Sequence, residues 1–200
     1  GFAALQAVRD AGEVGPGMRA LVIGASGGVG SFAVQIAKVL GAEVTGVAST
    51  RNLELVRALG ADAVVDYTRQ GIADGGRRFD VIVDIAGNRP LAELRRALEP
   101  DGTLVIVGGS GGSFTMGFGR TIRAMLLSPF VGQRLRGLIS SANHDDLVAL
   151  AALIEEGRLR PVVGATYPLA EAAEAIALVG AGRSRGKTVV TIPRPAGASA

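Results

Sequence analysis

Residues 21–37, LVIGASGGVGSFAVQIA, decide the fold of this chain of 200 residues. An apolar run over 20–23 ends at Gly24, four glycines fall within seven residues, and a second apolar run follows. A short, continuous apolar run is typical of a buried parallel strand. The run over 28–40, closed by Gly41, is typical of a helix with a glycine C-cap. The stretch therefore predicts a strand, a glycine-rich turn and a helix.

The same alternation continues along the chain after an opening helix over 2–11. We predict further strands at 43–48, 63–66, 81–84, 103–107 and 134–139. Apolar residues at helical spacing predict helices at 53–59, 91–98, 120–127 and 145–156. Repeated strand–helix units require parallel strands with right-handed crossovers. We therefore predict an α/β fold, a Rossmann-type doubly wound parallel sheet.

The pattern changes after Gly157. A strand at 161–163, an Ala/Glu-rich helix at 169–179 and a strand at 187–192 precede a polar tail rich in Pro and Ala. We predict a nucleotide-binding domain at 1–157, a C-terminal segment at 158–192 that returns toward another domain, and a disordered tail at 193–200. The chain opens in a helical pattern without a starting Met, so we expect it to be part of a longer polypeptide.

Composition narrows the class of protein. With 48% hydrophobic and 20% charged residues, the chain is expected to fold. Its net charge of +3 is scattered, without interleaved aromatic residues, which argues against a nucleic-acid partner. No apolar run reaches about 18 uncharged residues, so no membrane span is expected. The absence of cysteine excludes a thiolate nucleophile or Cys-ligated zinc within this chain and fits a cytoplasmic protein.

The glycine turn predicts an anion site. Backbone amides and the helix dipole at such a turn face the pyrophosphate in dinucleotide-binding folds. When Gly27 and Gly30 are aligned with the usual fingerprint, Ala25 stands where the first glycine normally lies. Gly27 would let the backbone approach the phosphates, and Gly30 would let the helix pack close to the strand. The alternative is a tight strand–helix turn that binds nothing.

The end of the second strand indicates which dinucleotide fits. An NAD site usually places an acid there for the ribose hydroxyls. Here Ser49, Thr50 and Arg51 follow Ala48, without a carboxylate at the strand end. Hydroxyls and a guanidinium suit a 2′-phosphate, so we predict NADP(H) as the cofactor. The alternative is that Ser49 or Thr50 caps the next helix and Arg51 is solvated.

Longer motifs carry a resemblance to a known family. GASGGVGSFAVQIAKVLGAEVTGVASTRNLELVRALGADAVVDY at 24–67, FDVIVDIAGN at 79–88 and GTLVIVGG at 102–109 stand in the same order as in that family. The chain resembles the nucleotide-binding domain of the medium-chain dehydrogenase/reductase superfamily, and is most similar to its zinc-independent, quinone-oxidoreductase-like branch. Members begin with a GroES-like domain that supplies most of the substrate pocket, and this chain does not contain it.

The resemblance implies cofactor contacts along the carboxyl edge of the sheet. Three groups of residues are implied: Ser26, Gly27, Gly28 and Val29 around the pyrophosphate; Ser49, Arg51 and Tyr67 at the 2′-phosphate; and Ala86, Val107, Gly109, Leu138 and Ser140 toward the nicotinamide. Within the last group, the backbone of Leu138 and Ser140 would meet the nicotinamide carboxamide. Tyr67 has a structural alternative, as a surface tyrosine that covers the adenine-side edge.

The implied activity is hydride transfer from NADPH to a quinone, enone or similar small-molecule acceptor. The alternatives are a zinc-dependent alcohol dehydrogenase of the same superfamily, an enoyl reductase module and a non-catalytic NADPH-binding module. No residue is assigned as catalytic and no metal site is expected. His144 fits a loop or cap, Asp145 and Asp146 fit a first helical turn, and hydride transfer needs no carboxylate at Asp84. We also expect a homodimer formed through the sheet edge near 134–140.

Overall fold

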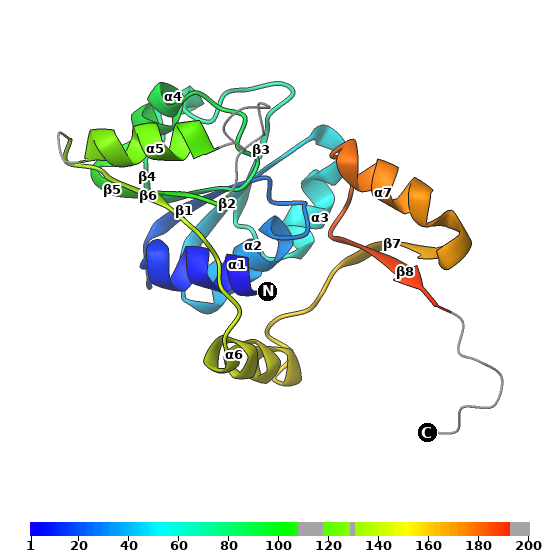
Figure 1. The fold of residues 1–200 in the computed structure, drawn as a ribbon. Helices are drawn as coiled ribbons and strands as arrows, with labels where there is room; N and C mark the ends of the chain where they lie inside the picture. The colour runs from blue at the N-terminus through cyan, green and yellow to red at the C-terminus, as the bar shows by residue number, and fades with distance from the viewer. Residues whose placement is uncertain (108–117, 129–130, 193–200) are drawn as a thin grey trace.

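A computed structural model describes residues 1–107, 118–128 and 131–192 of the chain. Its centre is a six-stranded parallel sheet with the order β3-β2-β1-β4-β5-β6 (Figure 1). The strands are β1 (Arg19–Ile23), β2 (Glu43–Ala48), β3 (Ala63–Asp66), β4 (Phe79–Asp84), β5 (Leu98–Ile106) and β6 (Arg134–Gly137). This is the strand order of dinucleotide-binding folds, and the predicted α/β fold is confirmed.

Helices cover both faces of this sheet. They are α1 (Phe2–Leu5), which continues as a π-helix (Gln6–Ala11), α2 (Gly30–Val39), α3 (Leu53–Ala58), α4 (Leu91–Arg96), α5 (Phe118–Leu127) and α6 (His144–Glu155). Because strand side chains alternate between faces, Ala20 and Val22 of β1 join the core under α1, α2, α3 and α6. Leu21 and Ile23 join the core under α4 and α5. The central strands β1, β2 and β4 are therefore buried on both faces over most of their length, as the continuous apolar run at 20–23 predicted for β1.

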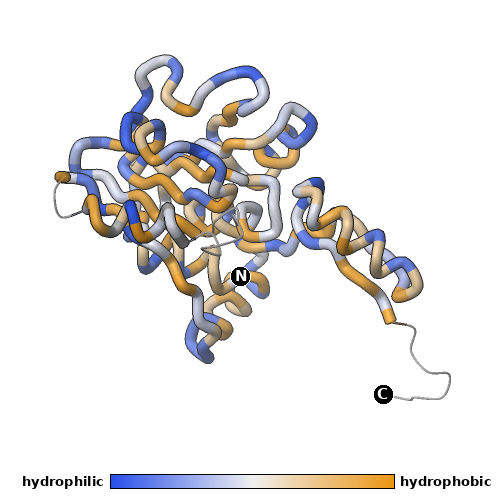
Figure 2. The backbone as a smooth tube through the Cα atoms, turned by 45° about the horizontal axis from the view of Figure 1, so that its top comes forward, coloured by the Kyte–Doolittle hydropathy of each residue, from blue (hydrophilic) through white to orange (hydrophobic). Residues whose placement is uncertain are grey.

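A second, two-stranded parallel sheet follows. It consists of β7 (Val163–Pro168) and β8 (Lys187–Thr191), joined through a 3-10 turn (Leu169–Glu171) and α7 (Ala172–Gly180). Figure 2 shows apolar residues along this unit, which stands out from the main body. Ile176 and Val179 of α7 are more than half exposed. The domain boundary placed near Gly157 stays a prediction.

Several predicted boundaries were wrong. The strand placed at 161–163 begins at Val163 and runs to Pro168, since β7 pairs with β8 over that length. The strand placed at 103–107 begins at Leu98, because Leu98 already pairs with Phe79 ahead of a bulge.

The strand placed at 134–139 ends at Gly137, and the chain then turns away to pair Ser141 with Gln6. The helix placed at 28–40 begins at Gly30, because the glycine turn continues through Val29. The loop after β5 and the tail predicted at 193–200 lie outside the described residues.

Candidate functional site

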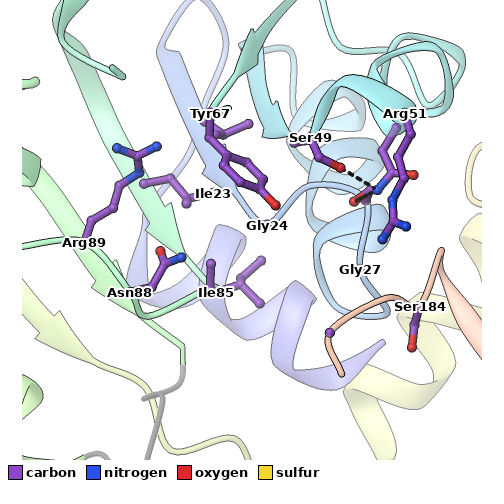
Figure 3. Close-up of a pocket in the computed structure, with 16 residues that line it drawn as sticks. Ile23, Gly24, Gly27, Ser49, Arg51, Tyr67, Ile85, Asn88, Arg89 and Ser184 are labelled. Carbon is purple, nitrogen blue, oxygen red and sulfur yellow. Dashed lines mark hydrogen bonds between the residues drawn. The ribbon is translucent and has the colours of Figure 1, made fainter. Parts of the chain in front are cut away.

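A pocket of about 380 Å³ opens at the carboxyl edge of the main sheet. It lies where β1, β2 and β4 end, beside the point at which the strand order reverses. Ligands of open α/β sheets bind at this switch point. The lining comes from the ends of β1, β2, β3 and β4 and from the C-terminal segment, and Figure 3 shows side chains from each of these around the pocket. Six predicted residues line it: Ser26, Gly27, Ser49, Arg51, Tyr67 and Ala86.

The glycine turn forms the floor of the pocket. Gly24 has a φ of +85°, so the sharp turn falls one residue before Ala25, which is fully buried and needs no unusual backbone conformation. A Cβ at Gly30 would lie 2.0 Å from the carbonyl oxygen of Gly24, whereas a Cβ at Gly27 would meet only that oxygen, at 3.4 Å. Gly30 is therefore needed for close helix–strand packing, and Gly27 leaves the pocket surface open.

Asn52 ties the glycine turn to the end of β2. It is 4% exposed, and its side-chain amide donates to the hydroxyl oxygens of Ser26 (3.1 Å) and Ser49 (3.3 Å). Its Oδ1 is buried and has no partner within the described part of the chain. Asn52 was not predicted as a site residue, because an Asn after Ser-Thr-Arg looks locally like an ordinary helix start.

The helix-capping alternative for the hydroxyls is not what the structure shows. Ser49 precedes a 3-10 turn (Thr50–Asn52), and its side chain accepts no capping hydrogen bond from the amides of that turn. The hydroxyl of Thr50 donates to Asp66 instead, so Thr50 does not line the pocket. The Arg51 guanidinium lines the pocket and forms no ion pair with any residue the structure describes. This leaves a cation and a hydroxyl at one end of the pocket.

The opposite side of the pocket comes from the ends of β3 and β4. Tyr67 follows β3, is 52% exposed and extends toward the cavity (Figure 3). Ala86, Asn88 and Arg89 follow β4, and Arg89 pairs with Glu93 on α4. Asn88 and Arg89 were not predicted. Their only signal is their place in the loop after a strand that ends at this edge of the sheet.

The C-terminal segment forms a further wall that the sequence did not indicate. Gly182 and Ser184 line the pocket, and the Gly186 amide donates to the carbonyl oxygen of Ser26 at 2.8 Å. The Lys187 ammonium lies 5.9 Å from the centre of the Phe32 ring. A Cβ at Gly28 would lie 3.0 Å from that ammonium nitrogen. A cation therefore lies beside the start of α2.

The other predicted cofactor residues do not line this pocket. Gly28 faces Gly186 and Lys187. The Val107 amide donates to the Asp84 carbonyl oxygen, and the Leu138 amide donates to the Ile106 carbonyl oxygen, so each residue adds one backbone hydrogen bond beyond the end of its strand. Both side chains are partly buried against the core. Val29 and Ser140 lie outside the lining, and Gly109 lies outside the described residues. Their roles around the cofactor stay predictions.

The acidic candidates have structural partners. Asp146 is 3% exposed and accepts hydrogen bonds from Gln6 (2.6 Å), Arg9 (2.6 Å) and Asn143 (2.7 Å). These bonds lower the pKa of Asp146 to about 2. The side-chain oxygen of Asn143 caps α6 by accepting a hydrogen bond from the Asp146 amide. Asp84 is fully buried and accepts from the Gly87 amide.

His144 is simply the first residue of α6. Across the described ranges, no group of three or more His, Cys, Asp or Glu side chains could hold a metal ion.

Comparison with known proteins identifies the family. Residues 59–190 match the family model described as zinc-binding dehydrogenase. The chain belongs to the zinc-binding dehydrogenase family. Within it, the relatives below are named as quinone and NAD(P)H oxidoreductases, and the resemblance to the quinone-oxidoreductase-like branch of the medium-chain superfamily is confirmed.

Two relatives of this zinc-binding dehydrogenase illustrate the match. Mouse (Mus musculus) NAD(P)H oxidoreductase RTN4IP1, mitochondrial, is 37% identical over 192 residues, which cover 88% of this chain and 48% of the relative. The chloroplast envelope quinone oxidoreductase homolog of Arabidopsis thaliana is 32% identical over 200 residues, covering 95% and 59%. The chain thus spans about half the length of the curated relatives it matches.

Solved structures agree with this assignment. The quinone oxidoreductase from Coxiella burnetii superposes with a TM-score of 0.83 at 29% identity, covering 96% of this chain and 58% of that one. A solved NAD-dependent alcohol dehydrogenase superposes with a TM-score of 0.79 at 32% identity, covering 96% and 56%.

The described helices of this dehydrogenase chain include none with the length and apolarity to cross a bilayer. Two of the relatives carry mitochondrial or chloroplast in their names, so a cytoplasmic location stays a prediction.

Proposed function

We propose that this chain is the cofactor-binding part of an NADPH-dependent oxidoreductase that passes a hydride to a quinone, enone or similar small-molecule acceptor. One observation carries the proposal. The pocket at the switch point ends in Ser49 and Arg51, and no carboxylate is among its described lining residues. A guanidinium and a hydroxyl favour a 2′-phosphate, which an acid would repel. The acceptor class is supported by the names of relatives, which include an NADPH-dependent alkenal/one oxidoreductase.

The residues present fit a dinucleotide with this phosphate. The open surface at Gly27 admits the pyrophosphate to the backbone, and the start of α2 favours its charge. Lys187 adds a positive charge beside that helix start. Tyr67 and Ala86 border the space between the two ends of the pocket. The chain's own residues thus bind and orient the cofactor, and the nicotinamide, when bound, supplies the hydride.

The described residues do not fit the metal in the family's name. Three or four Cys, His or carboxylate ligands are needed to hold zinc, and no such group exists among the residues described. We therefore assign no residue of this chain to zinc. We also propose a cytoplasmic location, with which the absence of cysteine in this chain is compatible.

Calorimetric titration of the 200-residue chain with NADPH and with NADH tests the proposal. Replacing Arg51 with Ala should weaken NADPH binding by about 10- to 150-fold, since a hydrogen bond to a charged group contributes roughly 1.5–3 kcal/mol. Binding of NADH should change little, because it lacks the 2′-phosphate. Arg57→Ala is the matched control: this arginine is exposed on neighbouring α3, pairs with Glu54 and lies outside the pocket.

Two results would contradict the proposal. Equal affinity of the unaltered chain for NADPH and NADH would favour an NAD enzyme, such as the alcohol dehydrogenase that superposes on this chain. An equal loss of NADPH binding in Arg51→Ala and Arg57→Ala would show that general charge, rather than a contact, attracts the cofactor.

A further inference from the structure

A carboxylate does lie next to the end of β2, but it comes from the neighbouring strand. Asp66 is the last residue of β3 and pairs in register with Ala48, the last residue of β2. It is only 7% exposed. In an NAD site, an acid near this position offers its oxygens to the ribose hydroxyls. The role of Asp66 therefore bears directly on cofactor choice.

Both oxygens of Asp66 are already used within the protein. Oδ2 accepts the hydroxyl of Thr50 at 2.5 Å, and Oδ1 accepts the hydroxyl and the amide of Thr68 at 2.7 and 3.0 Å. The two threonine hydroxyls lie 3.1 Å apart. The exposed Arg69 guanidinium adds a loose ion pair at 3.7 Å. Hydrogen bonding, above all from Thr50, lowers the pKa of Asp66, so the carboxylate is ionised at neutral pH.

These bonds join the two segments that carry the pocket's 2′-phosphate end. Thr50 begins the 3-10 turn that contains Arg51, and Thr68 directly follows Tyr67. Arg51 and Tyr67 line the pocket, whereas Asp66 does not. The Asp66 carboxylate therefore links the segment that carries Arg51 to the segment that carries Tyr67, without itself lining the pocket. We call Asp66, Thr50 and Thr68 the carboxylate latch.

We propose that Asp66 is a positioning residue that sets the separation of Arg51 and Tyr67 and thereby the preference for a 2′-phosphorylated cofactor. This inference rests on the proposed function and assigns the source of its selectivity. Charge-assisted hydrogen bonds to phosphate hold only within a narrow range near 2.7–2.9 Å, and a misplacement of about 1 Å can cost on the order of 100-fold. Two segments that end different strands need a fixed link to meet that tolerance.

The charge of Asp66 and its positioning role act in opposite directions. A negative charge beside a phosphate opposes binding, whereas the latch holds the phosphate's donors in place. Replacement by Asn and by Ala separates the two effects. An Asn can accept from Thr68 through its oxygen and donate to the Thr50 hydroxyl through its amide, so it removes the charge and keeps the latch. Ala removes both.

We would titrate each variant of the 200-residue chain with NADPH, NADH, adenosine 2′,5′-bisphosphate and adenosine 5′-monophosphate. Asp66→Ala should lose about tenfold or more in affinity for the two 2′-phosphorylated probes and little for the other two, the size expected for losing one charged contact. Asp66→Asn should keep most of the preference. Thr50→Val, which removes one donor of the latch, should give an intermediate loss and serves if Asp66→Ala does not fold.

Asp62→Ala is the matched control. This carboxylate precedes the opposite end of β3, where it accepts from Lys38 and the Val44 amide, far from the pocket lining. Its removal should lower the free energy of unfolding without changing the NADPH-to-NADH affinity ratio. Thermal unfolding of every variant shows whether any binding change follows from lost stability.

The outcomes are distinguishable. An unaltered affinity ratio in Asp66→Ala and Thr50→Val, tighter NADPH binding in both Asp66 variants, or an equal loss in Asp62→Ala would each overturn the positioning role while the proposed function stands. If the unaltered chain itself shows no preference for NADPH, the proposed function fails, and the inference fails with it.

Discussion

Replacing Gly30 with Ala should destabilise the fold, although Ala is the better helix former. The added Cβ would lie 2.0 Å from the Gly24 carbonyl oxygen and 2.8 Å from the Cα of Ala25. Both obstacles are backbone, so α2 and the turn would have to separate by about 1 Å, and overpacking of this kind costs roughly 1–3 kcal/mol. We take the upper end of that range, because no flexible side chain can yield.

The gain in helix propensity offsets part of this cost. Ala is about 1 kcal/mol more favourable than Gly inside a helix, and Gly30 is only the first residue of α2. The expected net loss is about 2 kcal/mol, which corresponds to a fall in Tm of about 4–8 °C for a chain of this size. Thermal unfolding followed by circular dichroism measures it.

Two other glycines give matched comparisons. At Gly27 the new Cβ makes only an ordinary contact of 3.4 Å, and at Gly15 it meets nothing within 4 Å. Gly27→Ala should therefore unfold like the unaltered chain, within about 0.5 kcal/mol, but bind both NADPH and NADH at least about tenfold more weakly, because its methyl group projects where the pyrophosphate approaches the backbone. Gly15→Ala should change neither property. Undiminished stability of Gly30→Ala, or undiminished binding by Gly27→Ala, would refute the reasoning.

Three further predictions concern charge and assembly. Lys187→Ala should weaken NADPH and NADH equally, by about tenfold, because the ammonium lies beside the start of α2 rather than near Arg51; a selective loss of NADPH in the same titrations would contradict this. The pKa of Asp146 is lowered to about 2, so its contribution to stability is present above about pH 4 and is lost as the pH falls toward 2. In Asp146→Asn, the free energy of unfolding, measured by urea denaturation, should depend less steeply on pH between about pH 4 and pH 2. An unchanged pH dependence in this variant would contradict the prediction. We also propose a homodimer formed through β6 at the sheet edge, which a monomeric mass in sedimentation at high concentration would contradict.

The main sheet could be predicted because its signals are local. The continuous apolar run at 20–23 predicts β1, and the positive φ at Gly24, one of the glycines of the predicted turn, marks where the chain leaves this strand. Boundaries failed where pairing partners decide them. Leu98 belongs to β5 because it pairs with Phe79 of β4. β6 ends at Gly137, and the segment that follows it forms a hydrogen bond to Gln6 through the Ser141 amide. The sequence around Leu98 does not indicate its pairing with Phe79, and the sequence around Gly137 does not indicate the contact with Gln6.

The residues of the candidate site likewise include some that local sequence predicts and others that depend on contacts distant in the sequence. Ser26, Gly27, Ser49 and Arg51 could be predicted, since each follows directly from a strand end and its turn. Asp66 could not, because its contact with Thr50 depends on the register between β2 and β3. Nothing local to Gly182 or Ser184 indicates that they reach a turn more than 150 positions earlier in the chain.

Ser26 shows why the C-terminal segment matters to the pocket. Its hydroxyl oxygen accepts from Asn52 on one side, and its carbonyl oxygen accepts from the Gly186 amide on the other. The glycine turn is thus held from the β2 end and from the C-terminal segment before any ligand arrives. A loop fixed in its binding conformation loses less entropy when the ligand binds. The segment after Gly157 therefore forms part of the candidate site, since Gly182 and Ser184 line the pocket and Gly186 holds the glycine turn.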